Sequence, residues 1–540
     1  MEKPCKVVLP SDLSIEQKIG QMVIAQAFGR FRSDSAAEYV ALQRLVEEVH
    51  ISGFKIYHGY ALGMLMLATH LEAHSDVPLF FASDLEMGLG QQFADAPRFP
   101  PAAAFGAAGS LELAFRSGKQ VGKEALRLGI NLVFAPLLDL HSPGDKYFGS
   151  RCISSDPYIT AEIGSHFFLG VTEAGALSTA KYFPGNGEQK FYDDGSTINR
   201  QKRERLEEWE WLPFVTAIRT GVSAVMVSHG AFPGLDAVPW NSAAGIIPAA
   251  LSRQVVTEIL RKELGFDGLI ITDALNLPFL RRYTMREIAC NAVSAGSDVL
   301  VALTTPQDAL EAIKGIYDSL DQGLVSEVQI DQSVRRILNA KRKISLKRLG
   351  LQPLQLESNL FGSDESLAVI VEIAEKSITL LKKPEKDFPI LERPTSFKGI
   401  LVGSSKAVEQ IQPDHWQPWH TFSQVEGVSV NWIEIDPLKA IENQLSPVND
   451  YKSVILVPLQ TEDETVNATL TLLNHLNEIG KRVILALPLS PNEAVKLAPL
   501  AWASLWMPDF YQASRWALLS VITGGRQATG QIRQSIWVPK

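Results

Sequence analysis

The segment that decides the fold is LGFDGLIITDALNL at residues 264–277. Its central run, Leu269–Thr272, is apolar or β-branched throughout, which is typical of a strand buried on both faces of a parallel sheet. Asp273 follows this run directly. We therefore predict a buried strand that ends at Asp273, with a helix beginning just after it. A carboxylate at that point faces a pocket or, as the alternative, caps the helix.

The same alternation extends outward from this segment over about residues 13–345, where short apolar runs are separated by longer amphipathic stretches. That rhythm is typical of βα units around a parallel sheet. It predicts a (β/α)₈ TIM-type barrel at residues 1–346, although one of its eight strands is not located by the pattern. The other expected strands are Gly53–Ile56, Leu79–Ala82, Leu132–Ala135, Leu177–Ala180, Ala224–Val227 and Val299–Ala302.

A second domain is expected after the barrel. Residues 347–364 lose the strand rhythm and are predicted to be a linker. In residues 365–540, apolar β-rich runs are again separated by helical patterns, which favours an α/β sandwich with a mostly parallel sheet. The runs are Gly399–Val402, Ser453–Val457 and Arg482–Leu487.

Composition limits the function. The 540 residues are 46% hydrophobic and 21% charged, as expected of a soluble globular chain. A net charge of -9 gives no general attraction to phosphate groups, so we expect no nucleic-acid partner. The chain start lacks the pattern of a secretory leader and no run is long enough to span a bilayer, so we expect no membrane association and a cytoplasmic location.

Metal and cofactor chemistry is not expected either. The three cysteines are isolated from one another and show no metal-ligand spacing; they are Cys5, Cys152 and Cys290. We predict neither a metal nor an organic cofactor. The sequence does not predict the oligomeric state.

Polar residues follow several of the predicted barrel strands. In TIM-type barrels the chemistry is carried by the carboxyl ends of the strands and the loops after them. His229 could face the pocket or could be a structural histidine with local hydrogen bonds. The residues at these strand ends are Asp84, Glu86, Asp139, Lys181, Ser228, His229 and Asp273.

Several segments, in this order along the chain, together resemble glycoside hydrolase family three. They are PLFFASDLEMG at 78–88, GINLVFAPLLDL at 129–140, SSDP at 154–157, SHGAFPGLD at 228–236, AALSRQVVTEILRKELGFDG at 249–268, ITDALNL at 271–277 and EIAEKSITLLKK at 372–383. The last resembles the opening of the family's second domain. Ordered matches over most of a chain are more specific than any one motif.

The resemblance implies roles for individual residues. Asp273 matches the nucleophile of the family, and Asp84 matches the carboxylate that holds sugar hydroxyls. Arg151 and Lys181 match the basic residues that bind the same ring, and Tyr182 stands beside them where relatives carry a histidine. We also place His229 among the candidate sugar-binding residues.

The acid/base residue of the family is altered here. The N-acetylglucosaminidase branch has K-H-F-P-G-H-G and a later loop histidine, whereas this chain reads KYFPGNGEQKFYDDGSTINR at 181–200. No histidine lies between His166 and His229. The remaining candidates in the barrel loop are Glu188, Asp193 and Asp194. The β-glucosidase branch takes its acid/base from a second-domain loop, where this chain offers Glu462 and Glu464.

The resemblance predicts a retaining exo-β-glycosidase, similar to β-N-acetylglucosaminidases that act on cell-wall-derived sugars such as muropeptides. Met87 and Gln92 depart from the N-acetylglucosaminidase pattern, so a β-glucosidase remains an alternative. A catalytically impaired sugar-binding or scaffold protein is a third interpretation. The sequence predicts neither the sugar and its linkage nor whether water or phosphate completes the reaction.

Overall fold

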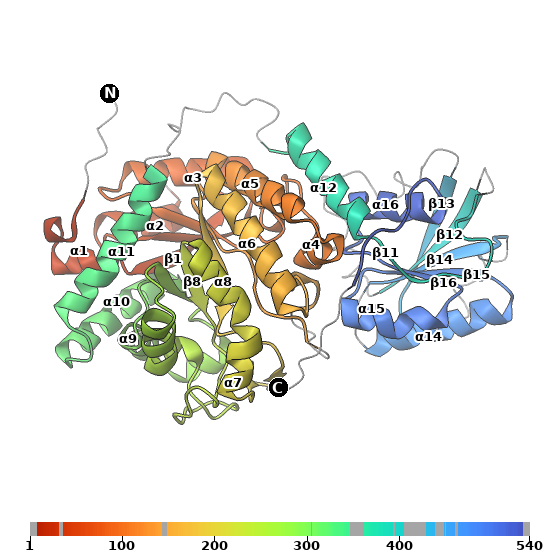
Figure 1. Ribbon diagram of the computed structural model, residues 1–540. Coiled ribbons are helices and arrows are strands. Elements are labelled where there is room, and N and C mark those ends of the chain that lie inside the picture. Colours follow the sequence, from red (N-terminus) through yellow and green to blue (C-terminus); the bar gives the residue numbers. More distant parts are fainter. Residues whose placement is uncertain are drawn as a thin grey trace.

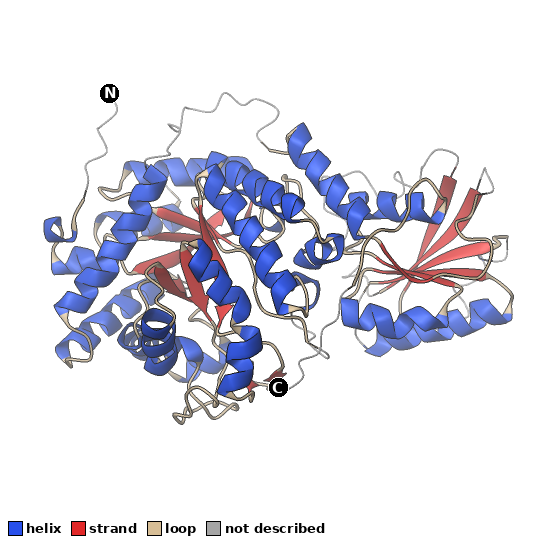
Figure 2. Ribbon diagram, in the orientation of Figure 1, coloured by secondary structure: helices blue, strands red, loops and turns tan. Residues whose placement is uncertain are grey.

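The computed structural model describes residues 8–31, 36–142, 148–303, 305–345, 361–391, 395–403, 428–437, 448, 450–459 and 463–532. Two bodies are visible, a barrel ringed by helices and a smaller sandwich beside it (Figures 1 and 2). The long helix α12 (Asp364–Ser377) runs between them. The predicted linker at 347–364 lies mostly outside the described residues, between the end of α11 at Ser345 and the start of α12.

The first body is an eight-stranded parallel sheet in the order β10-β1-β2-β3-β4-β5-β8-β9. A parallel bridge between Ile271 and Val299 joins the two outer strands, so that the sheet closes into a barrel. The predicted TIM-type barrel is therefore confirmed. The strands are β1 (Val23–Gly29), β2 (Gly53–Gly59), β3 (Phe80–Ser83), β4 (Leu132–Val133), β5 (Leu177–Phe183), β8 (Ala224–Val227), β9 (Leu269–Thr272) and β10 (Leu300–Leu303).

Strand β1 is the one that the sequence pattern did not locate. Its neighbours in the barrel are β2 and β10, and both pairings are parallel. The strand interrupts its apolar run with Gln26 and carries three small residues among seven. A weakly β-branched run of this kind has a low strand propensity, and its place in the barrel is set by pairing on both sides.

Helices cover the outside of the barrel (Figure 2). Helix α5 packs along α6, and α9 packs along α10. A short antiparallel hairpin, β6 (Gln189–Phe191) with β7 (Thr197–Asn199), projects after β5. The barrel helices are α1 (Ile15–Gly20), α2 (Ala37–Glu47), α3 (Ala61–Ala73), α4 (Ala102–Ala108), α5 (Leu111–Arg127), α6 (Pro157–Ala174), α7 (Arg203–Arg205), α8 (Leu212–Thr220), α9 (Met285–Ala295), α10 (Pro306–Asp321) and α11 (Glu327–Ser345).

The second body is a six-stranded sheet in the order β11-β16-β15-β14-β12-β13. Only the β11–β16 pair is antiparallel, which confirms the predicted mostly parallel sheet. Helix α16 covers one face, and α14 and α15 cover the other (Figure 1). The elements are β11 (Thr379–Lys382), β12 (Thr395–Val402), β13 (Val428–Ile435), β14 (Ser453–Pro458), α14 (Asp463–Glu478), β15 (Arg482–Leu487), α15 (Pro491–Leu497), β16 (Ala503–Trp506) and α16 (Gln512–Ile522).

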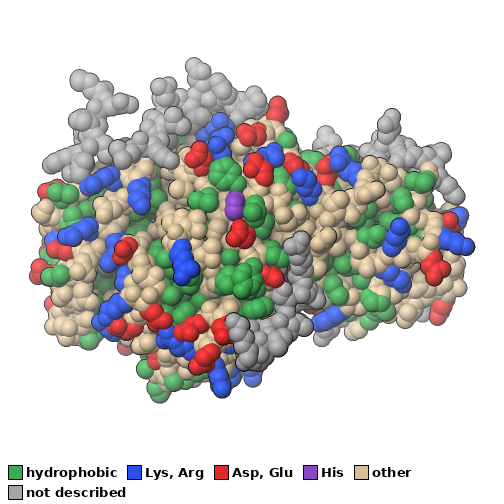
Figure 3. Space-filling view, viewed as in Figure 1, with side chains coloured by type: hydrophobic (Ala, Val, Ile, Leu, Met, Phe, Trp, Pro, Cys, Tyr) green, Lys and Arg blue, Asp and Glu red, His purple; other side chains and the backbone are tan. Residues whose placement is uncertain are grey.

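The surface carries both signs of charge. On the face seen in Figure 3, Lys and Arg side chains are interspersed with Asp and Glu. Within the described ranges, no helix combines the length and the apolar character that crossing a membrane requires. The same residues contain no cluster of three or more His, Cys, Asp or Glu side chains arranged to hold a metal ion.

Candidate active site

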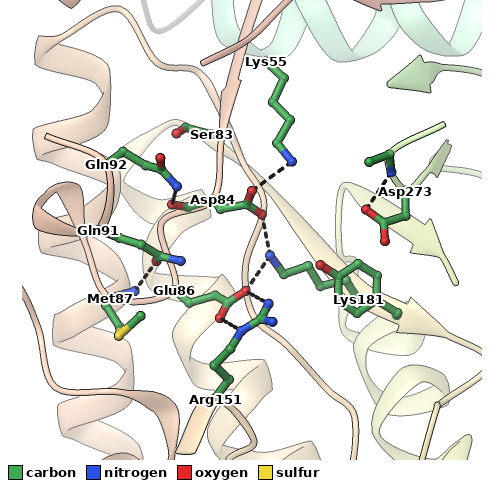
Figure 4. A network of polar contacts seen from close by, with 12 residues as sticks. Lys55, Ser83, Asp84, Glu86, Met87, Gln91, Gln92, Arg151, Lys181 and Asp273 are labelled. Carbon is green, nitrogen blue, oxygen red and sulfur yellow. Dashed lines mark hydrogen bonds and ion pairs between the residues drawn. The ribbon is translucent and has the colours of Figure 1, made fainter. Parts of the chain in front are cut away.

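Charged side chains from β2, β5 and the end of β3 meet in one cluster (Figure 4). Asp84 follows β3, Lys55 comes from β2 and Lys181 from β5. The Asp84 carboxylate bridges the two lysines: Lys181 Nζ lies 2.7 Å from its Oδ1, and Lys55 Nζ lies 3.0 Å from its Oδ2. The Lys181 side chain is fully buried and that of Lys55 is 7% exposed, so bulk water screens neither pair well.

Glu86 extends this network to Arg151. Both guanidinium contacts are made, from Arg151 Nε to Oε2 at 2.9 Å and from Nη2 to Oε1 at 2.7 Å. Such a two-point pair fixes the plane of both groups. Lys181 Nζ lies 2.6 Å from the same Oε1. Lys181 therefore links Asp84 with Glu86, and three cations share two carboxylates.

The network sets the ionisation of its members. Burial by itself would raise the pKa of Asp84, but the ammonium groups of Lys181 and Lys55 outweigh it and hold that pKa well below its usual range. Burial by itself would also raise the pKa of Glu86, but the charges of Lys181 and Arg151 lower it to about 2. Burial would lower the pKa of Lys55, yet the Asp84 charge raises it above its ordinary value. All of these groups are charged at neutral pH.

Asp273 stands at the end of β9 and faces the network, with Asp84 and Lys181 across the space between them (Figure 4). Its Oδ1 accepts a hydrogen bond from the Ala274 backbone amide at 2.7 Å. The helix predicted to begin after Asp273 is absent; the next element is the 3-10 helix η7 (Pro278–Arg282), capped at Leu277. That prediction was wrong, and with it the helix-capping alternative for Asp273 loses its basis. The carboxylate is half-buried beside the charged cluster.

His229 is buried near Asp273. Neither ring nitrogen has a hydrogen-bond partner of ordinary geometry, and the ring packs edge-on against Phe279. Burial lowers the pKa of this imidazole, although the Asp273 charge and the nearby backbone groups of 273 and 274 act in the opposite direction. His229 therefore lies buried beside the Asp273 carboxylate, with the backbone of Asp273 and Ala274 next to its ring.

The loop after β5 is held by Asp139. Its carboxylate accepts the backbone amides of Tyr182 at 3.1 Å and of Asn186 at 2.6 Å. Burial raises the pKa of the Tyr182 phenol well above its ordinary value, and the Asp273 charge adds to this. Tyr182 is therefore a phenol that keeps its proton near Asp273. Asn186 Oδ1 accepts from Ser228 Oγ at 2.6 Å, which ties the loop to the end of β8.

Asp194 braces the β6–β7 hairpin. Its Oδ1 accepts from both the amide and the hydroxyl of Ser196, at 3.0 and 2.6 Å, and its Oδ2 accepts from the Ala243 amide at 2.8 Å. Its slight burial would raise the pKa of Asp194, but these hydrogen bonds lower it. A leaving-group acid needs the opposite shift. Asp193 and Glu188 are exposed on the same segment, and Glu188 accepts a hydrogen bond from Gln201.

The second domain contains two of the acid/base candidates, Glu462 and Glu464. Glu464 lies in the first turn of α14 and is exposed to solvent. Glu462 lies outside the described residues. The labelled charged side chains of the network in Figure 4 all come from the barrel.

Sequence reasoning missed Lys55. The residue lies inside the strand predicted at Gly53–Ile56, in the run GFKIYHG. A lysine in the middle of an otherwise buried strand is itself a signal, because burying an ammonium is costly unless a carboxylate meets it. The carboxylate is Asp84, just after the neighbouring strand β3, whose pairing with β2 places Lys55 opposite Ala82.

A cluster of charged and hydroxyl-bearing side chains at the carboxyl ends of barrel strands defines a barrel enzyme whose ligand is rich in hydrogen-bonding groups. Comparison with known proteins identifies the family of this barrel enzyme. The family model "Glycosyl hydrolase family 3 N terminal domain" matches residues 14–340. The chain belongs to glycosyl hydrolase family 3, as the resemblance of its motifs predicted.

Individual relatives are similar over large parts of the chain. A β-N-acetylglucosaminidase/β-glucosidase of Cellulomonas fimi is 26% identical over 388 residues, which cover 70% of this chain and 66% of the relative. β-Hexosaminidase A of Pseudoalteromonas piscicida is 27% identical over 330 residues, 58% of this chain and 54% of the relative. The chain thus spans between half and two thirds of these relatives.

The fold of both domains recurs in a solved structure. A family 3 β-N-acetylglucosaminidase from Paenibacillus sp. str. FPU-7 superposes with a TM-score of 0.83 at 27% identity. The match covers 97% of this chain and 99% of that one. The barrel followed by a sandwich is therefore a shared architecture.

Proposed function

We propose that this chain is a retaining exo-β-glycosidase with Asp273 as the nucleophile. The observation that carries the proposal is the position of Asp273, which faces a continuous chain of ion pairs between three cations and two carboxylates. In the first step the Asp273 carboxylate attacks the anomeric carbon and the glycosidic oxygen leaves. Water then cleaves the glycosyl ester and regenerates the carboxylate.

The network supplies the binding part of this mechanism. Asp84 has lone pairs free beyond its two lysine contacts and can accept sugar hydroxyls, whereas Arg151 and Lys181 can donate to ring substituents. Because Lys181 also contacts Glu86, its ammonium is fixed in place before a substrate arrives. Fixed donors and acceptors lower the entropic cost of orienting the anomeric carbon against Asp273.

We infer that the substrate is a β-N-acetylglucosaminide, because the relatives from Cellulomonas fimi and Paenibacillus are named β-N-acetylglucosaminidases and the relative from Pseudoalteromonas piscicida is named a β-hexosaminidase. A β-glucoside is the second candidate, because the Cellulomonas fimi relative is named for both activities. We further propose that muropeptide-derived sugars in the cytoplasm are the natural source. Subcellular fractionation would test the cytoplasmic location, and turnover of purified muropeptides would test the natural substrate.

The test of the activity uses a panel of aryl β-glycosides, including the N-acetylglucosaminide and the glucoside. The wild type is expected to release the aryl alcohol from at least one of them. Asp273→Asn keeps the size of the side chain and is expected to lower kcat by about four orders of magnitude or more, as loss of a nucleophile does. A wild type that binds the sugars but turns over none would support the sugar-binding interpretation instead.

The acid/base candidates are separated on a disaccharide, whose leaving group is not activated and therefore needs acid help. Asp194→Asn is expected to weaken the hairpin while leaving kcat within about threefold, because its hydrogen bonds lower the pKa of Asp194, the opposite of what a leaving-group acid needs. Glu464→Gln is expected to behave like the wild type, since Glu464 is exposed on α14. A large drop in kcat for either variant, with unchanged unfolding, would return that carboxylate to the mechanism.

A further inference from the structure

Lys55 is the charged residue of the site that neither the motifs nor the strand ends pointed to. Its side chain extends from β2 toward Asp84, with Asp273 on the other side of the space that it enters (Figure 4). The ammonium group is 3.0 Å from Asp84 Oδ2, and it lies 4.6 Å from the centre of the Tyr57 ring. The side chain is only 7% exposed.

The geometry around Asp84 gives Lys55 a defined task. Lys181 holds one oxygen of that carboxylate and Lys55 holds the other, so the carboxylate cannot rotate without losing a charged hydrogen bond. An ammonium has three N–H donors. One is directed to Asp84 and a second to Tyr57, which leaves a third donor for a ligand in the space toward Asp273.

The balance of charge points to the kind of ligand. The ion-paired network holds three cations, Lys55, Arg151 and Lys181, against the two carboxylates of Asp84 and Glu86. Asp273 supplies a third negative charge beside it, and its charge acts on Lys55. The set is then neutral, and an anionic sugar would add an uncompensated charge to a buried site.

We propose that Lys55 is a sugar-positioning residue, which orients Asp84 from the side opposite Lys181, donates to the sugar held between Asp84 and Asp273, and fits the site to a neutral sugar. This inference rests on the proposed function for its substrate and deepens it. Lys55 contributes binding that is present both before and during the reaction. Its loss therefore raises KM more than it lowers kcat.

The experiment is a double-mutant cycle of Lys55→Met and Asp84→Asn. Methionine keeps the apolar stem and removes the ammonium. We expect Lys55→Met to raise KM at least about tenfold in the wild-type background, and to change it less than about threefold in the Asp84→Asn background, because groups in contact are not additive. Lys55→Arg, which keeps the charge, is expected to recover part of the affinity.

Lys341→Met is the matched control. Lys341 is also a fully buried barrel lysine, but its ammonium contacts Gln21 and the Ser52 carbonyl rather than the network. The Lys341→Met variant is expected to leave KM unchanged. Additive effects of Lys55→Met and Asp84→Asn, no rescue by arginine, or a similar rise in KM for Lys341→Met would overturn the proposal.

A second measurement separates this inference from the proposed function. Calorimetric binding of free N-acetylglucosamine and glucose to the same variants needs no turnover, so the cycle can be read even if the wild type hydrolyses nothing. If Lys55→Met were unfolded, Lys55→Gln would replace it in the cycle. An aryl β-glucuronide turned over faster than the neutral glycosides would contradict the neutral-sugar part of the proposal.

Discussion

Glu210 is a buried carboxyl group directly behind the loop that follows β5. It belongs to the π-helical turn η4 (Leu206–Glu210), and its side chain is 2% exposed. Its carboxyl group packs so closely on the loop that a Cβ at Gly187 would lie 2.5 Å from Oε1. Burial raises the pKa of Glu210 to about 8, although Arg205 at 3.5 Å lowers it in part. A neutral acid group therefore supports the loop that carries Tyr182 and Asn186.

This position makes the free energy of unfolding depend on pH. Between the ordinary pKa near 4.5 and the folded value near 8, the folded state holds a proton that the unfolded state has lost. The contribution of Glu210 to the free energy of unfolding is fully present below pH 4.5 and is lost as pH rises through about 8. Glu210→Gln mimics the protonated form and is expected to unfold at the wild-type denaturant concentration at pH 5 and at a higher one at pH 8.5.

Chemical denaturation at those two pH values measures the effect. Exposed Glu208 on the same turn offers the matched control, and Glu208→Gln is expected to shift the unfolding midpoint equally little at both pH values. A Glu210→Gln protein that is less stable than the wild type at pH 8.5 would show that Glu210 is ionised and paired with Arg205 instead.

Single residues of the site were predictable to different degrees. Asp84 and Lys181 follow apolar runs, and the rule that chemistry lies at the carboxyl ends of barrel strands was enough to select them. Lys55 lies inside a strand and Glu210 on a helix, so neither could be selected by that rule. Their roles depend on which side chains face each other across the barrel, and a sequence read without spatial contacts does not give that information.

At the scale of elements, Asp298 joins several parts of the barrel wall. It precedes β10 and is completely buried. Its Oδ2 accepts from Arg261 at 2.5 Å and from the Ile270 amide of β9 at 2.9 Å, while its Oδ1 accepts from Ser333 of α11 at 2.7 Å. Arg336 of α11 adds an ion pair at 3.1 Å. One carboxylate thus connects β9, α11 and the π-helix η6 (Gln254–Glu263).

Removal of this carboxylate leaves two guanidinium groups without their common partner. Asp298→Ala is expected to lower the free energy of unfolding by about 3–5 kcal/mol, the usual cost of breaking one side of a buried ion pair. Asp267→Ala, which changes an exposed aspartate just before β9, is the control and is expected to cost little. A loss below about 1 kcal/mol for Asp298→Ala, measured by urea denaturation, would mean that water replaces the carboxylate.

Elements were predicted best where the apolar runs are long and β-branched. β8 and β9 begin and end at the predicted residues, whereas β1, rich in small residues and carrying Gln26, was not located. The helix expected after Asp273 was wrong because ALNLP has helical preference only up to Pro278, which starts the short 3-10 turn instead. Tertiary pairing decides such marginal segments.

At the scale of the whole molecule, the two domains share part of one core. Ala103 and Ala107 of barrel helix α4 are buried in the apolar cluster that contains Leu489 and Trp506 of the second domain. The Ala107 carbonyl also accepts from the Gln531 amide at 3.0 Å. Helix α12 packs on α4 and α5, where Arg116 pairs with Glu372 at 2.9 Å. Both side chains of that pair are about one-third exposed, so the pair contributes little to holding the domains together. Apolar packing is therefore the main attraction between the two domains.

The domains should therefore separate when charge is placed in this contact. Ala107→Glu places an unpaired carboxylate in an apolar cluster. Burying that charge is unfavourable, and the charge reaches water only if the second domain separates from the barrel. We expect calorimetry to show two unfolding transitions where the wild type shows one. Ala73→Glu, at an exposed helix end of the barrel, is the control and should leave a single transition. The charged network of Figure 4 consists of barrel residues, so the released barrel should still bind N-acetylglucosamine. Loss of that binding in Ala107→Glu alone would show that the second domain completes the sugar site.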